Sequence, residues 1–263
     1  MSIFILVPLL CGFLAGVVVN YLADVLPSTL RLSWPVCTNP DCQKPFTRID
    51  YLLFRRCRHC SKPRSWRNYI VLLGCLITGF SLWFPFPPRL GYALSLVVLI
   101  YLYTVALIDL EHRLILRPLS IAGLILTAIS GTILHGWFST LIGGLAGFAI
   151  MYFFYLFGKL FNRLRARRLG LDPKGMEEAL GSGDVTLATI LGLLLGWPLI
   201  WFGLFLGVLI AGFISLVVIL FLVFARKYRQ QAFMTFIPLG PAFIISSLLL
   251  VYLPNLIKVV LPN

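Results

Sequence analysis

Two aspartates of this 263-residue chain stand where a carboxylate is costly, each at the border of a long apolar segment. Asp184 lies in GSGDVTL (181–187), just before the apolar run ATILGLLLGW, and Asp109 lies near the middle of LYTVALIDLEHRLIL. A carboxylate that borders membrane-length apolar sequence is expensive to ionise and is usually functional. Two carboxylates within a few ångströms share one proton: the ionised group takes a proton from water while the protonated group hydrogen-bonds a carbonyl. The pair therefore fits aspartic hydrolysis of a peptide bond, which requires no cofactor.

A structural interpretation competes with this one. Asp184 can be a helix-end carboxylate, stabilised by the positive end of the helix that follows it. Asp109 fits that alternative poorly, because it ends its helix, where the dipole disfavours a negative charge. Gly181 and Gly183 carry no side chain and would let the backbone approach a substrate strand closely, although flexibility alone is the other interpretation of these glycines.

Four cysteines form a second candidate site. Cys37 and Cys42 lie in CTNPDC, Cys57 and Cys60 lie in CRHC, and fourteen residues separate the two pairs. This arrangement predicts a four-cysteine zinc knuckle, because two short turns bring four thiolates to the corners of a tetrahedron. A site with four protein ligands is structural, so the zinc would order the loop and cleave nothing. The alternative is four unmetallated thiols, since a reducing compartment disfavours disulfides.

The sequence around these sites is that of a membrane protein. The chain is 60% hydrophobic and only 12% charged, with a mean hydropathy of +0.96, far outside the range of soluble domains. Apolar segments recur at about 2–23, 69–86, 91–108, 118–135, 138–158, 184–197, 199–224 and 236–257. The predicted fold class is therefore all-α: a polytopic membrane protein with about eight transmembrane helices and a small cytoplasmic zinc-knuckle loop.

The basic residues predict how these helices are oriented. With the N-terminus outside, the connections that face the cytoplasm hold 20 of the 22 Lys and Arg residues, and the outer ones hold only Arg89 and Lys258. The net charge of +13 then reflects topology and attraction to anionic membrane lipids, not nucleic-acid binding. Both termini are expected outside, and both candidate sites at the cytoplasmic face.

This topology divides the chain into three parts. They are a first transmembrane helix (1–23), a cytoplasmic four-cysteine loop (24–68) and a transmembrane domain that carries the two aspartates (69–263).

Five segments in order make the chain resemble the type IV prepilin peptidases, bacterial aspartyl proteases with a G-x-G-D motif. The segments are GFLAGVVVNYLADVLP (12–27), the paired cysteines, IDLEHRLIL (108–116), GSGDVTLATILGLLLGW (181–197) and IPLGPAF (237–243). The resemblance implies a multi-pass endopeptidase of the bacterial inner membrane whose catalytic pair is Asp109 and Asp184. It also implies the substrates: prepilins or pseudopilins of type IV pili or protein secretion, cut after a short basic leader. Many members also methylate the new N-terminal amine with S-adenosylmethionine.

The chain departs from the family's usual pattern in three places. Thr186 stands where a lysine usually follows the second aspartate, Leu116 stands where a proline is common, and the first cysteine pair encloses four residues instead of two. The carboxylates are unaffected, so proteolysis remains the expected activity. The chain has no Gly-rich nucleotide turn, so the expectation of methylation depends on the resemblance alone.

Two rival functions use the same residues differently. A transporter or channel would relay protons or bind a cation through Asp109 and Asp184, but it predicts acidic groups near mid-membrane, whereas these lie at its rim. A presenilin-like protease shares G-x-G-D but lacks the cysteine loop and ends in a different proline motif. The expected partners are prepilin-like substrates and membrane lipids, with no nucleic acid.

Overall fold

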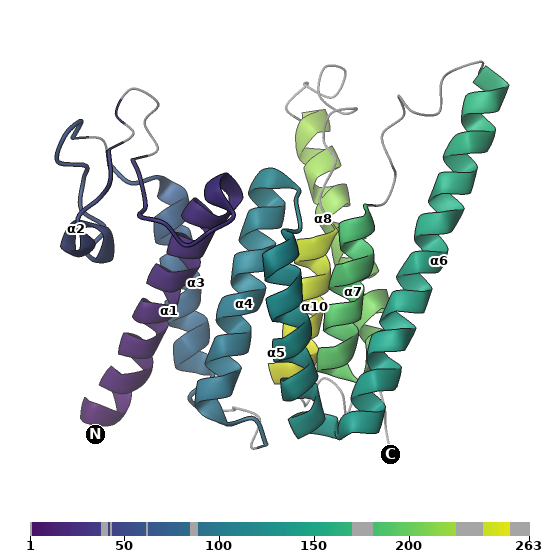
Figure 1. The fold of residues 1–263 in the computed structure, drawn as a ribbon, viewed down its shortest axis with the longest axis horizontal. Coiled ribbons are helices and arrows are strands. Elements are labelled where there is room, and N and C mark those ends of the chain that lie inside the picture. The colour runs from purple at the N-terminus through teal and green to yellow at the C-terminus, as the bar shows by residue number, and fades with distance from the viewer. Residues whose placement is uncertain are drawn as a thin grey trace. The chain divides into compact units, whose positions relative to one another are not determined.

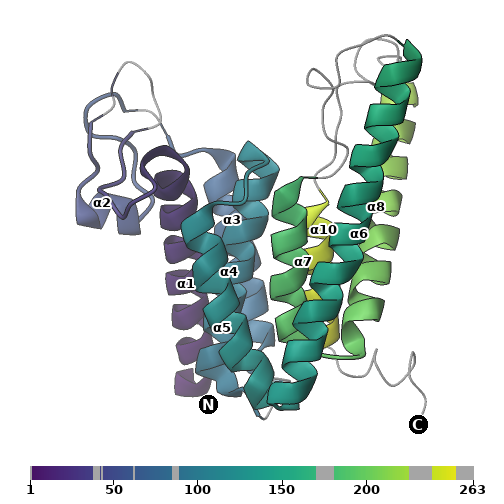
Figure 2. The same ribbon diagram turned by 45° about the vertical axis from the view of Figure 1, so that its right-hand side comes forward.

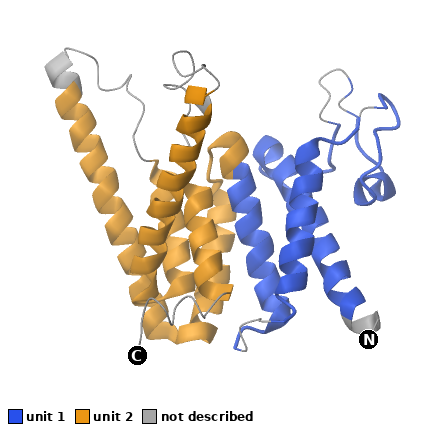
Figure 3. Ribbon diagram, turned by 180° about the vertical axis from the view of Figure 1, so that it is seen from behind, with its two compact units in different colours: residues 1–108 blue, residues 109–263 orange. Residues whose placement is uncertain are grey.

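The chain folds into two compact units, residues 1–108 and residues 109–263 (Figure 3). The computed structural model describes residues 2–37, 42, 44–61, 63–84, 89–169, 181–224 and 239–252. These residues contain no β-strand, only an isolated bridge between Val36 and Pro45. The predicted all-α class is confirmed. The boundaries predicted at residues 23 and 68 depend on which side of the membrane each segment faces, and they stay predictions.

The first unit is a small helical bundle. It holds α1 (Ser2–Thr29), α2 (Arg48–Leu52), α3 (Trp66–Ser81) and most of α4 (Gly91–His112) (Figure 1). α1 and α3 approach closely, because a Cβ on Gly12 would lie 2.9 Å from the carbonyl oxygen of Cys75. Ala15, Val19, Val71 and Cys75 form the buried core, and apolar side chains of α4 pack against it.

The second unit is built around α7. It holds α5 (Arg117–His135), α6 (Trp137–Leu169), α7 (Ser182–Leu195), α8 (Leu199–Phe224) and α10 (Gly240–Tyr252) (Figures 1 and 2). α7 contacts all four other helices. Its buried residues run from Val185 to Leu195, and the others in this range, Thr186, Thr189 and Leu193, are half-buried, so no side of the helix is fully exposed. A helix that is apolar all round is stable only when other elements cover it, so the bundle encloses α7 and places Asp184 at one end of the enclosure.

A row of glycines joins α6 to α7. A Cβ on Gly143 would overlap the carbonyl oxygen of Gly192, and a Cβ on Gly192 would overlap that of Gly143. One turn further along, a Cβ on Gly147 would overlap the carbonyl oxygen of Ala188. Such contacts bring two backbones together directly, as small residues do between transmembrane helices. We refer to Gly143, Gly147, Ala188 and Gly192 as the glycine seam.

Helix lengths and surfaces agree with a membrane location. Five helices are long and apolar enough to cross a bilayer: α1, α4, α5, α6 and α8. The other three predicted spans correspond to the shorter α3, α7 and α10, with 16, 14 and 13 residues. α8 exposes a band of large apolar side chains that would be unfavourable in water, including Phe205, Phe213 and Phe221. α6 continues 11 residues beyond the predicted end at residue 158, into its basic segment.

Candidate functional site

Asp109 lies in the last turn of α4 and is almost enclosed. Asp109 is 6% exposed, and its Oδ2 atom is buried without a hydrogen-bond partner of good geometry. The helix ends just beyond it, where the Arg113 N–H donates to the Asp109 carbonyl oxygen at 2.9 Å. Arg113 has φ +53°, a left-handed conformation that turns the chain out of the helix. The connection that follows, residues 113–116, leads into α5.

Asp184 occupies the first turn of α7. Its Oδ2 atom accepts the backbone N–H of Gly181 at 3.2 Å. This bond is one half of a capping box, since glycine has no side chain to supply the other half. The positive end of α7 also stabilises the carboxylate. Asp184 is therefore a helix-end carboxylate in geometry, as the structural alternative expects.

The structure also brings Asp184 to Asp109, which a capping role alone would not require. Gly240 lies against both the Asp109 carboxyl and the side chain of Leu187, three residues after Asp184 in α7, so the end of α4 and the start of α7 share one region. The start of α7 also contacts the α4–α5 connection: a Cβ on Gly183 would lie 3.2 Å from three side-chain carbons of Ile115. Gly183 thus makes room for Ile115, and its predicted contact with a substrate strand stays a prediction. Gly181 is exposed at the start of α7.

Thr186 lies one turn beyond Ser182 and is held by its own helix. Its hydroxyl donates to the Ser182 carbonyl oxygen at 3.3 Å. The side chain therefore supplies no cation next to the carboxylates, unlike the lysine that is usual at this position in the resembling family.

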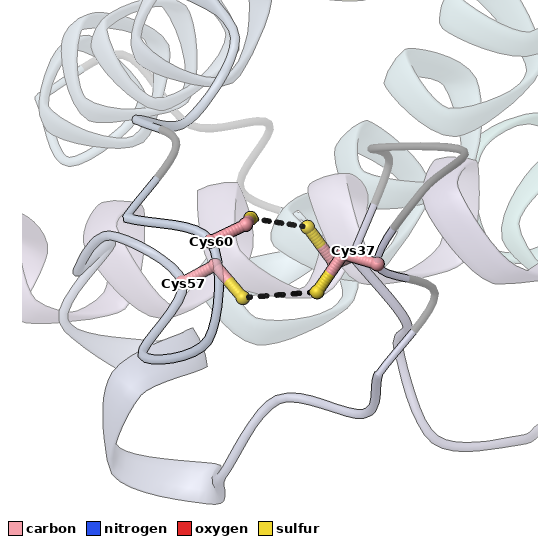
Figure 4. Close-up of side chains that lie close together, drawn as sticks. Cys37, Cys57 and Cys60 are labelled. Carbon is pink, nitrogen blue, oxygen red and sulfur yellow. Dashed lines mark hydrogen bonds between the residues drawn. The ribbon is translucent and has the colours of Figure 1, made fainter.

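The four predicted cysteines form one cluster in the first unit. Their sulfur atoms all lie within 4.8 Å of one another. The Sγ atoms of Cys37 and Cys60 are 3.6 Å apart, and those of Cys42 and Cys57 are 3.9 Å apart. Figure 4 shows Cys57 and Cys60 on one loop facing Cys37 on the other. The prediction that these residues share a site thus agrees with the structure.

Short turns place these sulfurs. The Cys37 N–H donates to the Lys44 carbonyl oxygen and the Phe46 N–H to that of Pro35, both at 2.9 Å, which closes a narrow loop around the first pair. The second pair lies in a tight turn, in which the backbone N–H groups of Cys60 and His59 donate to the Cys57 sulfur and lower the pKa of its thiol to about 6. These N–H groups stabilise the thiolate, which is the form that binds metal.

The cluster fits a zinc ion closely. Four sulfurs about 2.3 Å from a tetrahedral zinc lie about 3.8 Å apart. Two of the six sulfur–sulfur separations, 3.6 and 3.9 Å, bracket this value, and none exceeds 4.8 Å. Mixed nitrogen and oxygen sites have other dimensions, and a disulfide would need sulfurs at about 2 Å.

A buried ion network next to this cluster is not evident in the sequence. Asp24, near the end of α1, forms ion pairs with Arg64 and Arg67 and accepts the Tyr51 hydroxyl at 2.8 Å. The Arg64 guanidinium lies 4.1 Å from the ring centres of both Phe46 and Tyr51. Asp50 is likewise buried and pairs with Arg58. An aspartate at a helix end followed by an arginine-rich loop is the only sequence signal for this network.

Comparisons with known proteins point to one family. The model of the type IV leader peptidase family matches residues 96–220, the range that contains both aspartates. The chain is also similar to the prepilin leader peptidase/N-methyltransferase of Vibrio cholerae serotype O1, with 25% identity over 209 residues, 78% of this chain and 73% of the relative. No solved structure matches it.

Proposed function

We propose that this chain is a membrane peptidase of the type IV leader peptidase family, whose model matches residues 96–220, and that Asp109 and Asp184 are its catalytic pair. The observation that carries this proposal is that the end of α4 meets the start of α7: Gly240 lies against both Asp109 and Leu187 of α7, and Gly183 of α7 lies against Ile115 just after α4. The two carboxyl groups come from segments far apart in the sequence, and each borders apolar core.

The chemistry follows from the shared proton. The ionised carboxylate takes a proton from a water molecule, and the resulting oxygen nucleophile adds to the scissile carbonyl while the protonated carboxyl donates to its oxygen. The tetrahedral intermediate then collapses, the C–N bond breaks, and the leaving nitrogen receives the proton that was taken from water. Each turnover returns one proton to the pair, so no cofactor is consumed.

The substrates in this proposal are prepilins or pseudopilins. Their basic leaders would be cut at the cytoplasmic face of the inner membrane, where the positive-inside distribution puts the α4 end and the α7 start. A basic leader suits this site, because a carboxylate pair with one shared proton carries a net negative charge.

The cysteine cluster would hold a structural zinc ion. Cys37, Cys42, Cys57 and Cys60 would each supply one thiolate, and the ion would contribute folding energy by tying the two loops together. A site filled by four protein ligands leaves no position for water or substrate, so the proteolytic step uses the carboxylates alone.

Methylation of the new N-terminus is not part of the proposed mechanism and is tested by a separate assay. The name of the V. cholerae relative includes N-methyltransferase. Within the described part of this chain we identify no residue set that fits S-adenosylmethionine, and we derive no methylation step. Incubation of cut prepilin with methyl-labelled S-adenosylmethionine and this protein tests that activity independently of cleavage.

The test of the proteolytic proposal is cleavage of a prepilin by purified variants. Asp109→Asn and Asp184→Asn should each abolish cleavage, because asparagine keeps the shape of the side chain but neither accepts the proton from water nor shares one. Since the two carboxyls act as a unit, the double variant should be no slower than either single one. Glu111→Gln is the matched control: an exposed carboxylate two residues from Asp109, whose loss should leave most activity.

One result would favour the transporter alternative. If Asp184→Asn cut prepilin at a rate near wild type, Asp184 would be a helix cap only and the peptidase mechanism would fail. Proton or cation flux into vesicles that vanished in both aspartate variants would then support transport.

A further inference from the structure

α10 closes over the carboxyl group of Asp109 at a single residue. Gly240 is the first residue of α10, and the first turn is held by the Phe243 N–H, which donates to the Leu239 carbonyl oxygen at 3.1 Å. Gly240 is itself buried, as are Pro241, Ala242 and Phe243 after it. The start of this helix is therefore packed against the interior of the second unit.

The space at Gly240 is occupied by Asp109. A Cβ built on Gly240 would overlap the Oδ2 atom of Asp109 and would lie 3.1 Å from its Cγ and 3.3 Å from Cδ2 of Leu187. The backbone of Gly240 is outside the left-handed region, so conformational freedom does not explain the glycine. Position 240 requires a residue without a side chain, because the Asp109 carboxyl occupies the space that a Cβ atom would fill.

This contact restricts the carboxyl group. Oδ2 of Asp109 is fully buried without a hydrogen-bond partner of good geometry, and the backbone N–H of Gly240 interacts with the carboxyl group, so the packing and the backbone of Gly240 together limit its rotation on that side. Gly240 lies against one side of the carboxyl, while the charge of Asp184 acts on the same group. Misplacement of a catalytic group by about 1 Å can cost about 100-fold in rate. The Gly240 backbone, in direct contact with the carboxyl, can therefore affect the rate.

We propose that Gly240 is a positioning residue of the aspartate pair: its backbone, which carries no side chain, is the surface against which the Asp109 carboxyl rests and which fixes the position of that carboxyl. This inference depends on the proposed peptidase function. Gly240 contacts Asp109 and does not itself take part in the reaction, so its replacement should lower the catalytic rate and leave substrate binding nearly unchanged.

The experiment compares three Gly→Ala variants of the full-length protein, with a prepilin as the substrate. Gly240→Ala should lower kcat about 100-fold and change KM by less than about threefold. Gly207→Ala is the matched control for strain on α10, because a Cβ there would lie 2.9 Å from Cε1 of Phe243 and does not reach Asp109. Gly212→Ala is the neutral control, with nothing within 4 Å of the added atom.

A second measurement covers the case in which Gly240→Ala folds poorly. The methyl group and the carboxyl would compete for one space, so adding Asp109→Ala should restore most of the thermal midpoint that Gly240→Ala loses. Adding Asp109→Ala to Gly207→Ala should restore none of it. Independent effects of Gly240→Ala and Asp109→Ala on the midpoint would overturn the contact.

The outcomes separate this inference from the function on which it depends. If wild-type protein does not cut prepilin, or Asp109→Asn still does, the peptidase proposal fails. If wild type cuts, Asp109→Asn is inactive, and Gly240→Ala keeps a kcat near wild type, only the positioning role is lost. Equal kcat losses in Gly240→Ala and Gly207→Ala would assign the effect to displacement of α10 and would also refute the positioning role.

Discussion

Replacement of Asp24 by asparagine should destabilise the first unit strongly, although Asp24 has no part in the proposed chemistry. Asp24 is the single anion shown pairing with Arg64 and Arg67, and the side chains of Asp24 and Arg64 are only 10% and 7% exposed. The Nε and Nη2 atoms of Arg64 are buried without hydrogen bonds. Asparagine would keep a hydrogen-bonding shape and remove the charge, leaving the Arg64 cation buried and uncompensated.

The magnitude follows from these contacts. Removing one partner of a buried ion pair costs about 3–5 kcal/mol. Arg67 is 23% exposed and can be hydrated in part, and the Phe46 and Tyr51 rings still face the Arg64 cation, so the lower end of the range applies. A loss of about 3 kcal/mol corresponds to a fall in Tm of about 6–12 °C for a chain of this size.

The assay is thermal unfolding of the detergent-purified protein, followed by tryptophan fluorescence, with zinc content measured in parallel. Asp24→Asn should unfold well below wild type, and a second change, Arg64→Met, should recover stability by removing the uncompensated cation. Glu111→Gln, an exposed carboxylate, should unfold as wild type does. An Asp24→Asn variant that unfolds within about 1 °C of wild type would show that the network stores no folding energy.

Three further predictions concern the metal, the helix packing and the topology. Purified protein should contain about one zinc per chain by elemental analysis, and Cys57→Ser with Cys60→Ser should remove it and lower protease resistance; a metal-free preparation of full stability would contradict this. Gly192→Ala should cost at least about 1–3 kcal/mol in thermal unfolding, because backbone atoms cannot move aside, whereas Gly212→Ala should be neutral. Cysteine-accessibility labelling should find residues 30–65 and 160–180 on the cytoplasmic side, and labelling of 160–180 from outside would refute the predicted orientation.

Much of the fold was predictable because its signal is local. Each of the eight predicted apolar segments overlaps a described helix, since membrane-length apolar runs have few alternatives to a helix. The ends were less predictable: α6 continues to Leu169, because a helix can persist into basic sequence after the apolar run stops. The cysteine cluster was also predictable, since the spacing of thiols in two short turns already limits their geometry.

The rest depended on contacts between distant segments. Asp24 and Arg67 are 43 residues apart, and nothing in either segment names the other as its partner. Gly240 belongs to IPLGPAF, a segment useful for the family resemblance, yet only the packing of α10 shows that its missing side chain leaves room for Asp109. The informative property is the pairing of buried charges for Asp24 and the free volume next to the backbone for Gly240. Neither can be read from the order of residues along the chain.

The glycine seam limits how the peptidase can open. Side chains between helices act as compressible spacers, because they can change rotamer and let one helix slide or roll on its neighbour. At the seam, backbone of α6 meets backbone of α7 with no such spacer at Gly143, Gly147 and Gly192. The two helices should therefore move as one rigid body, with Asp184 fixed to it. An opening wide enough to admit an extended leader should then come from elements that meet α7 through side chains, namely α8, α10 and the α4–α5 connection.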